Sequence, residues 1–327
     1  MAEQSSFKQS LGLIDGTLIV IGSMIGSGIF IVSADITRHV GSAGWLVAVW
    51  LITGFMTITA AVSYGELSGM YPKAGGQYVY LKEAYNPLVA FLYGWSFFAV
   101  IQTATIAAVA IAFSKFAAYL LPAVGEDKVL WQTGDFKISA AQVVGIGIIA
   151  LLTWVNTRGL REGKFIQRVF TATKLISLFG LIIFGLLALK GDVWAANWGA
   201  DAWKIGKGSA ESGSWVITEY PAVTAILGAI AASMVGSVFS SDAWNNVTFI
   251  AGEMKNPQRN IGLSLFLGTL IVTIIYVSAN VMYTGVLPME SIAGAEKDRV
   301  AVAAAREIFG NLGTIIIAVM IMISTFG

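Results

Sequence analysis

The sequence predicts an all-α integral membrane protein in which the first and sixth membrane spans are broken. Hydrophobic residues make up 56% of the 327 residues and charged residues only 12%, against about 25% charged in an ordinary globular chain. The few charges fall mainly between long apolar runs, and two of these runs contain clusters of glycine or polar residues. A surface so poor in charge cannot be hydrated on all sides, so the length does not indicate two soluble domains.

The spans are counted from the gaps between charges. A transmembrane helix needs about 20 mostly apolar residues, and the apolar runs are continuous rather than alternating, as expected for helices. Eight stretches meet or approach that length: Gly16–Ala34, Val40–Gly65, Asn86–Ser114, Ile138–Thr157, Val169–Leu189, Tyr220–Ser241, Asn260–Met289 and Ile308–Gly327.

Composition also excludes several functions. The balance of 20 Lys and Arg against 19 Asp and Glu leaves no basic field for nucleic acid. With no cysteine and a single histidine, thiol nucleophiles, disulfides and cysteine-based metal sites are excluded. We expect no cofactor, no metal and no enzymatic activity.

Orientation is predicted from one short basic segment, Arg158–Arg168, which carries four positive charges. Placing this segment in the cytoplasm also places the N-terminus there. The leader contains Glu3 and Asp15 and has no cleavage site after a short apolar core, so we expect no signal peptide.

The first span contains Gly22, Gly26 and Gly28 within seven residues. Each glycine weakens a helix by up to about 1 kcal/mol relative to alanine. A nucleotide-binding loop is excluded because no strand precedes the segment and no Walker lysine follows. Two interpretations remain for this segment alone: close helix packing through a small-xxx-small spacing, or a broken helix whose exposed backbone groups bind something.

The sixth span favours the second interpretation. Asp242 follows 22 charge-free residues, and the chain is apolar again over Val247–Gly252. The sixth span then ends near Lys255–Pro257. An ionisable group inside a span indicates function by default. Two interrupted spans that lie five spans apart are the pattern of an inverted five-helix repeat with its site at the two breaks.

Lys174 is the second ionisable group within a span, and it also has two interpretations. Its ammonium can reach the membrane surface near Arg168 along its apolar stem. Alternatively, it faces the bundle interior and fills a cation position.

Five short motifs in this order resemble the L-type amino acid transporter branch of the amino acid–polyamine–organocation superfamily. They are Ile25–Phe30, Tyr64–Leu67, Lys73–Tyr78, Trp244–Asn245 and Glu253–Asn260. The resemblance covers essentially the whole chain and indicates a prokaryotic-like member. It implies a five-helix inverted-repeat transporter fold.

The resemblance also implies a division of the chain. Residues 1–189 would form the first repeat with spans one to five, 190–219 an outer loop, and 220–327 the start of the second repeat with spans six to eight. Members of the family usually have further spans. The second repeat is therefore incomplete, and we interpret the sequence as part of a longer chain.

The resemblance assigns the candidate site. Backbone N–H groups of Gly26, Ser27 and Gly28 would bind the carboxylate of an amino acid, as expected for the N-terminus of a half-helix. Lys174 would stand where sodium-driven relatives hold Na⁺, and Phe239 would cover the substrate. Backbone carbonyls that would meet the ammonium belong to Met24, Ile25, Phe239 and Asp242, and the remaining site residues are Ser240, Ser241 and Asn245.

The expected function is sodium-independent transport of amino acids by alternating access, as an exchanger or coupled to protons, with neutral substrates favoured. The alternatives are a cationic amino acid transporter that uses Asp242 and a non-transporting amino acid sensor of the same fold. We expect a multi-pass plasma membrane protein whose partners are amino acid and lipid. A disulfide-linked heavy subunit is excluded because the chain has no cysteine.

Overall fold

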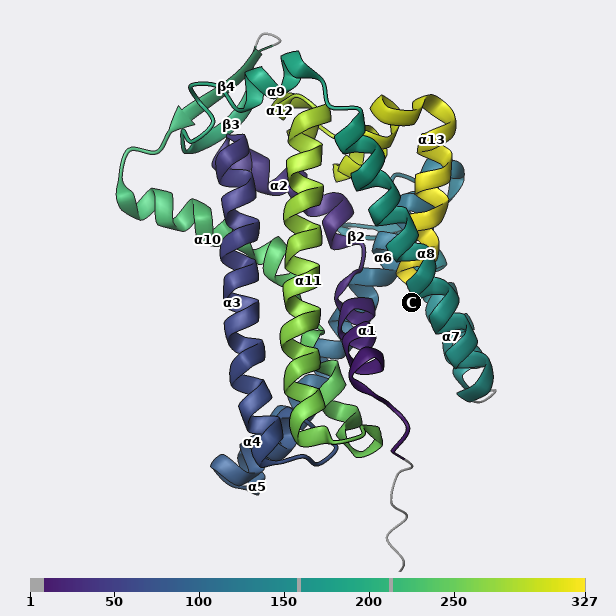
Figure 1. Ribbon diagram of the computed structural model, residues 1–327. Helices are drawn as coiled ribbons and strands as arrows, with labels where there is room; N and C mark the ends of the chain where they lie inside the picture. The colour runs from purple at the N-terminus through teal and green to yellow at the C-terminus, as the bar shows by residue number, and fades with distance from the viewer. Residues whose placement is uncertain (1–8, 158–159, 212–213, 327) are drawn as a thin grey trace, which may run out of the picture. The chain divides into compact units, whose positions relative to one another are not determined.

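The computed structural model describes residues 9–157, 160–211 and 214–326 (Figure 1). These residues form two compact units. Unit one comprises residues 1–25, 51–104 and 241–274, and unit two comprises residues 26–50, 105–240 and 275–327.

Among the described residues, five helical segments are long and apolar enough to cross a membrane, and the number rises to seven if two bent helix pairs each count as one span. The five segments are α3 (Ala43–Met70), Pro87–Leu120, Val223–Glu253, α11 (Pro257–Val286) and α13 (Val300–Phe326). The bent pairs are α1 (Leu13–Met24) with α2 (Gly28–Val40), and the apolar part of α8 (Leu160–Leu187) with α9 (Gly191–Asn197). A shorter apolar helix, α7 (Ala140–Thr157), occupies the stretch predicted as the fourth span. The chain is thus a mostly helical membrane protein, and the count of eight spans stays a prediction.

Both predicted interruptions are present in the backbone. Helix α1 ends at Met24, and Ile25 adopts an extended conformation with φ −73° and ψ 97° before α2 begins at Gly28. Helix α10 (Val223–Ser240) ends in a turn, where Ala243 is left-handed with φ 65°, and the 3₁₀-helix η3 (Trp244–Glu253) follows. A left-handed alanine is unfavourable because of its Cβ atom, so this turn is held by its surroundings.

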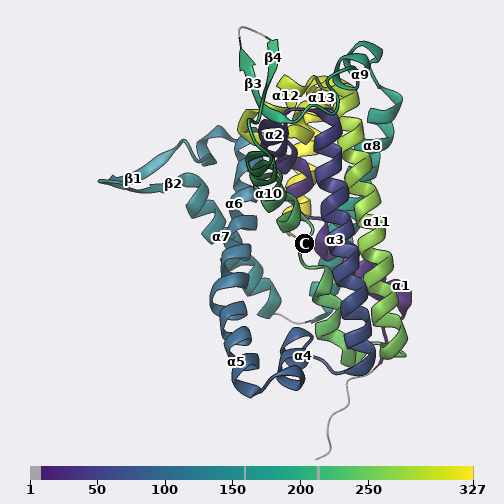
Figure 2. The same cartoon turned by 90° about the vertical axis from the view of Figure 1, so that its left-hand side faces the viewer.

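Unit one is organised by α3 and α11, which run side by side (Figures 1 and 2). A Cβ atom built on Gly65 would lie 3.0 Å from the Cα atom of Gly262, so the two helices approach with almost no side chain between them. After α3, Gly75 and Gly76 have φ values of 121° and 50° and turn the chain into the short helix α4 (Gln77–Ala84). Only glycine adopts such values readily.

The span that follows contains a π-helical segment. It consists of α5 (Pro87–Ser96), the π-helix η1 (Phe97–Gln102) and α6 (Thr103–Leu120). The hydroxyl of Thr103 donates to the carbonyl of Phe98 at 2.9 Å, five residues back. Single π-turns of this kind are frequent at functional sites.

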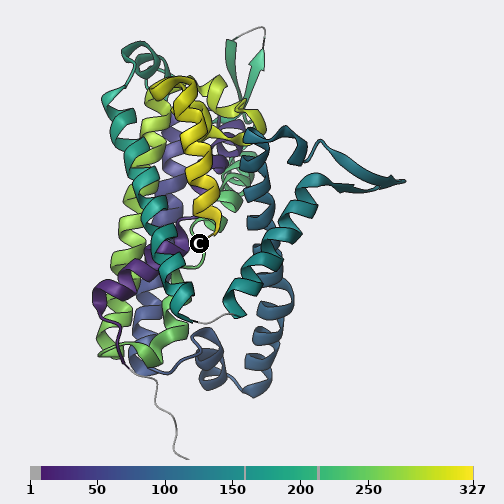
Figure 3. The same ribbon diagram turned by 90° about the vertical axis from the view of Figure 1, so that its right-hand side faces the viewer.

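Unit two contains α2 packed against α10, and α8 packed against α13 (Figures 1 and 3). It also contains the two hairpins. Strands β1 (Val129–Thr133) and β2 (Phe136–Ser139) join η2 (Pro122–Val124) to α7, and strands β3 (Gly206–Glu211) and β4 (Ser214–Glu219) join α9 to α10. Both hairpins are antiparallel. The short elements α12 (Met289–Ala293) and η4 (Glu296–Asp298) lie between α11 and α13.

The segment 190–219, expected to be a loop, therefore contains the helix α9 and the strands β3 and β4. Its tryptophans act as packing and hydrogen-bonding groups. Trp215 donates to the carbonyl of Gly41 at 2.6 Å, at the C-terminal end of α2, and Trp45 donates to the carbonyl of Trp203 at 2.9 Å.

Candidate functional site

In unit two, the start of α2 lies directly against the end of α10. A Cβ atom built on Gly28 would lie 2.0 Å from Oγ and 3.1 Å from Cα of Ser240. One turn into both helices, a Cβ atom on Gly236 would lie 2.6 Å from a methyl carbon of Val32. The N-terminus of one half-helix and the C-terminus of another therefore meet at Gly28 and Ser240, and the contact requires glycine at position 28.

Helix α11 holds both ends in place through a row of buried polar side chains. The hydroxyl of Tyr276 donates to the carbonyl of Ser240 at 3.0 Å, and the hydroxyl of Tyr283 donates to the carbonyl of Ile29 at 3.3 Å. Between them, the hydroxyl of Ser33 donates to Oδ1 of Asn280 at 2.7 Å. The three α11 residues recur at i, i+4 and i+7, so they lie on one helical face.

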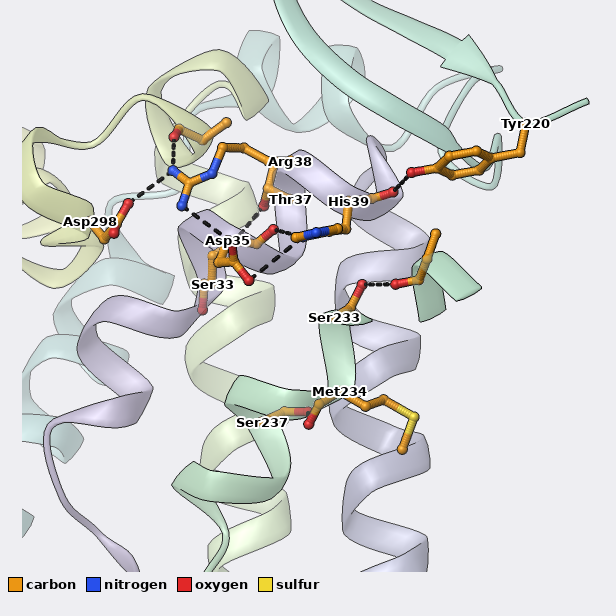
Figure 4. Close-up of polar contacts among 12 residues, drawn as sticks. Ser33, Asp35, Thr37, Arg38, His39, Tyr220, Ser233, Met234, Ser237 and Asp298 are labelled. Carbon is orange, nitrogen blue, oxygen red and sulfur yellow. Dashed lines mark hydrogen bonds and ion pairs between the residues drawn. The ribbon is translucent and has the colours of Figure 1, made fainter. Parts of the chain in front are cut away.

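The far end of α2 carries an ionic network (Figure 4). The guanidinium of Arg38 donates to the carbonyl of Ala293 at 2.7 Å and to Oδ1 of Asp298 at 2.9 Å. His39 lies 3.6 Å from the carboxylate of Asp35. The hydroxyl of Tyr220 donates to the carbonyl of His39 at 2.8 Å. Burial raises the pKa of this phenol, which keeps it a donor at neutral pH.

These contacts tie the end of α2 to the α12–η4 segment and to the start of α10. Within α10, the hydroxyls of Ser233 and Ser237 donate to the carbonyls of Ala229 and Met234, respectively (Figure 4). Phe239, by contrast, leaves 46% of its surface exposed. The side chain predicted to cover a substrate is therefore not ordinary core packing within its unit.

In unit one, the start of α1 is bound to the end of η3 by main-chain hydrogen bonds. The N–H groups of Ser10 and Leu11 donate to the carbonyl of Glu253 at 3.0 and 3.1 Å, and the N–H of Lys255 donates to the carbonyl of Leu11 at 2.8 Å. These bonds form a short parallel bridge between Leu11 and Met254.

An aromatic cluster surrounds the start of η3. The rings of Tyr64 and Trp244 meet edge to face with centroids 5.0 Å apart, and Tyr64 also meets Tyr80 at 5.8 Å. Phe97 of the π-segment contacts Phe249 at 5.8 Å. Burial, with a smaller contribution from Tyr64, raises the pKa of Tyr80 to about 12, so its phenol stays neutral at physiological pH.

The predicted site residues are divided between the two units. Met24, Ile25, Ser241, Asp242 and Asn245 belong to unit one, and Gly26, Ser27, Gly28, Phe239, Ser240 and Lys174 belong to unit two. The side chain of Asp242 is exposed, whereas those of Ser27, Ser240, Ser241 and Asn245 are buried. The structure directly brings together Gly28 and Ser240.

Lys174 is 2% exposed and is one of the largest fully enclosed side chains. Its role as a sodium-site substitute stays a prediction. The basic segment used for orientation includes residues 158–159, which lie outside the described residues. Orientation therefore stays a prediction.

Sequence reasoning missed the polar row on α11 and the aromatic cluster at η3. A signal for the first was present, because Tyr276, Asn280 and Tyr283 share one helical face of an otherwise apolar span. Among the described residues, no group of three or more His, Cys, Asp or Glu side chains is placed to hold a metal.

The chain matches known transport proteins along its length. The family described as Amino acid permease matches residues 11–327. The chain is 31% identical over 324 residues to large neutral amino acids transporter small subunit 2 of Homo sapiens, which covers 98% of this chain and 55% of that protein. It is 28% identical over 302 residues to b(0,+)-type amino acid transporter 1 of Oryctolagus cuniculus, which covers 90% of this chain and 56% of that protein.

The chain thus spans about half the length of the curated relatives that it matches. The family and these relatives are transporters and not enzymes. The match includes α1, α2, α10 and η3, the four helices that flank the two interruptions. The chain therefore belongs to the amino acid permease family of the amino acid–polyamine–organocation superfamily and fits its L-type branch.

Proposed function

We propose that this chain forms the substrate-binding part of a sodium-independent amino acid carrier that works by alternating access. The observation that carries the proposal is the approach of Gly28 to Ser240, where a Cβ atom would lie 2.0 Å from the serine hydroxyl. The approach places a helix N-terminus, which favours anions, beside a helix C-terminus, which favours cations. A free amino acid carries both charges at a separation suited to such a pair of helix ends.

The break in α1–α2 supplies the anion half of this site. The first N–H groups of a helix have no partner within the helix, and here they belong to Ser27, Gly28 and Ile29 at the start of α2. The side chain of Ser27 does not cap the helix. These groups, with the backbone of Gly26, would bind the substrate carboxylate.

The end of α10 supplies the cation half. Its last carbonyls include those of Phe239 and Ser240. The hydroxyl of Tyr276 donates a hydrogen bond to the carbonyl of Ser240 at 3.0 Å and so holds it in place. In the proposed site, Met24 and Ile25 add carbonyls from the end of α1, and Asp242 adds its own. Phe239, with 46% of its surface exposed, would close over the bound molecule.

A competition assay tests this site. In proteoliposomes, uptake of a labelled amino acid should be inhibited by the unlabelled amino acid, but neither by its methyl ester nor by the amine that lacks the carboxylate. The ester control removes only the negative charge, and the amine removes the whole group. Equal inhibition by the amine and its parent acid would show that the start of α2 does not bind a carboxylate.

Lys174 supports independence from sodium. An ammonium buried to 2% exposure in an apolar span costs about 2.5–3.5 kcal/mol on insertion scales, so it persists only where it has polar partners or a role. Standing in for Na⁺, it would brace carbonyls of the broken first span. Uptake should then be unchanged when Na⁺ is replaced by choline. Lys174→Ala should lower uptake strongly, whereas Ile176→Ala, at a position 65% exposed on the same helix, should not.

Neutral amino acids are the favoured substrates, because the proposed site uses mostly uncharged backbone groups. The exposed carboxylate of Asp242 keeps cationic substrates as the second candidate. Asp242→Asn preserves the size of the side chain and removes its charge. A selective loss of lysine and arginine binding would establish the cationic role, whereas a uniform loss for leucine and lysine would assign Asp242 to the shape of the break.

A further inference from the structure

The β1–β2 hairpin is amphipathic, and its strand register shows which side chains share a face. Trp131 pairs with Ile138 and Thr133 pairs with Phe136, whereas Gln132 pairs with Lys137. Residues directly opposite in an antiparallel pair point to the same side of the sheet. Near the turn, one face therefore carries Trp131, Thr133, Phe136 and Ile138, and the other carries Gln132 and Lys137. Val129 and Ser139 lie on the second face at the base of the hairpin.

The apolar face is exposed. Trp131 leaves 53% of its surface uncovered and Phe136 leaves 63%, although their rings contact each other edge to face at 6.0 Å. In a hairpin that stood in water, these two rings would be an unfavourable exposed patch. The hairpin projects sideways from the helices of unit two, whereas the β3–β4 hairpin points along them (Figures 2 and 3).

The hairpin is continuous with an exposed apolar helix. Helix α7 begins at Ala140, immediately after β2 ends at Ser139. On α7, Val143 and Ile146 are 48% and 68% exposed, as expected for an apolar helix of a membrane protein. Its 18 residues make α7 about 27 Å long, close to the thickness of the hydrocarbon core. With α7 as a membrane span, the hairpin would start at the level where hydrocarbon gives way to lipid headgroups.

The base of the hairpin is fixed to the rest of unit two by contacts that do not involve the apolar face of the hairpin. The N–H of Ala140 donates to the carbonyl of Lys128 at 2.8 Å, and the carboxylate of Asp127 pairs with Lys297 of η4. This pairing lowers the pKa of Asp127 and keeps it ionised. The anchored base sets the angle at which the strands leave α7.

We propose that the β1–β2 hairpin lies in the membrane interface, with Trp131 and Phe136 inserted among the lipid headgroups and upper acyl chains. Aromatic side chains concentrate at this depth because their rings are apolar and their edges polar. Gln132 and Lys137, on the opposite face, remain in water, where the lysine also favours lipid phosphate. Trp154, 54% exposed near the other end of α7, would mark the opposite interface.

The absence of cysteine allows a direct test by single-site spin labelling. Thr133→Cys places a label on the apolar face and leaves both aromatic rings in place. Gln132→Cys is the matched control, one residue away on the other face. Ile146→Cys on α7 gives the hydrocarbon reference. Each labelled chain is reconstituted in phosphatidylcholine vesicles, and collisions with dissolved O₂, which concentrates in lipid, are compared with collisions with a water-soluble nickel chelate.

We expect the O₂-to-nickel collision ratio at position 133 to be several-fold higher than at position 132 and to lie below that at position 146. Replacing Trp131 and Phe136 together by serine should bring the ratio at 133 down to that at 132. Equal ratios at the two positions in the unmodified hairpin would overturn the proposal, because the hairpin would then stand in water. A label at 133 that is immobile and shielded from both reagents would also overturn it, because protein would then cover the face.

Discussion

The two halves of the interrupted spans are held by different chemistry in the two units. In unit one, α1 is joined to the end of η3 by N–H groups of Ser10, Leu11 and Lys255, all main-chain donors. In unit two, α2 can approach α10 closely because Gly28 has no side chain. Side chains of α11 then hold α2 in place by hydrogen bonds. Main-chain bonds tolerate most substitutions, whereas side-chain contacts do not. Single substitutions should therefore have larger effects at the α2–α10 contact of unit two than at the bridge between α1 and η3 of unit one.

The largest expected effect is at Gly28. Gly28→Ala adds a Cβ atom that would lie 2.0 Å from Oγ of Ser240, so α2 and α10 must separate. Overpacking of this kind costs about 1–3 kcal/mol, and a displaced site should lose amino acid binding about 10- to 100-fold. Equilibrium binding in detergent measures the loss.

Two matched variants sharpen this prediction. A Cβ atom added at Gly228, on α10 outside the proposed site, meets nothing within 4 Å, so Gly228→Ala should bind almost normally. Adding Ser240→Gly to Gly28→Ala removes the closest contacts and should restore part of the affinity. A weak effect of Gly28→Ala, equal to that of Gly228→Ala, would mean that the approach of the two helices is not needed for binding.

A smaller effect is expected at the centre of the α11 row. Asn280→Leu leaves the hydroxyl of Ser33 without its acceptor at 2.7 Å, and both residues are fully buried. An unsatisfied buried polar group costs about 1–3 kcal/mol. The midpoint of thermal unfolding should fall, and Ser33→Ala added to Asn280→Leu should recover part of the loss. No recovery in the double variant would show that the cost comes from packing instead.

At the bridge between α1 and the end of η3 in unit one, removal of a main-chain donor should have the largest effect. Leu11→Pro deletes the N–H that donates to the carbonyl of Glu253 at 3.1 Å, at an expected cost of about 1 kcal/mol or more. Leu11→Ala keeps this donor and is the control. If both variants unfold at the same temperature, the bridge between Leu11 and Met254 does not stabilise unit one.

The smallest effect is expected at Ser264, also in unit one. Its hydroxyl donates to the carbonyl of Leu13 at 3.2 Å, but that carbonyl already accepts the hydroxyl of Thr17 at 2.9 Å. Ser264→Ala should therefore cost less than about 1 kcal/mol. A fall in stability as large as that of Asn280→Leu would contradict the contrast between the two units.

The helical membrane class and the two interruptions could be predicted from the sequence, because their causes are local. Glycines at 22, 26 and 28 and the polar group at 242 weaken a helix wherever the surrounding chain lies. Charge gaps located the helices but not their ends. Helix α3 continues to Met70 past Glu66, and α11 begins at Pro257 before Arg259, because charged side chains are tolerated at helix ends outside the hydrocarbon.

The contacts across the chain could not be predicted in the same way. The hydroxyl of Tyr283 finds the carbonyl of Ile29, which is 254 positions away, and nothing in either neighbourhood encodes the pairing. The hairpins were missed because each carries only a few alternating residues. Lys174 shows the converse case, since its sequence allows two interpretations and its 2% exposure is a property that the sequence does not reveal.

The π-helical turn at Phe97–Gln102 changes which residues of the third span share a helical face. Each residue of an α-helix advances by about 100° around the axis, and a π-turn inserts one extra residue without adding a full α-turn. A helical wheel that is continued from Pro87 to Leu120 therefore assigns the residues after Thr103 to the wrong side. The span has two angular frames joined at η1. A deletion of one residue within 97–102 would remove the extra residue and allow one helical wheel to describe both halves, an effect that substitutions in this segment do not have.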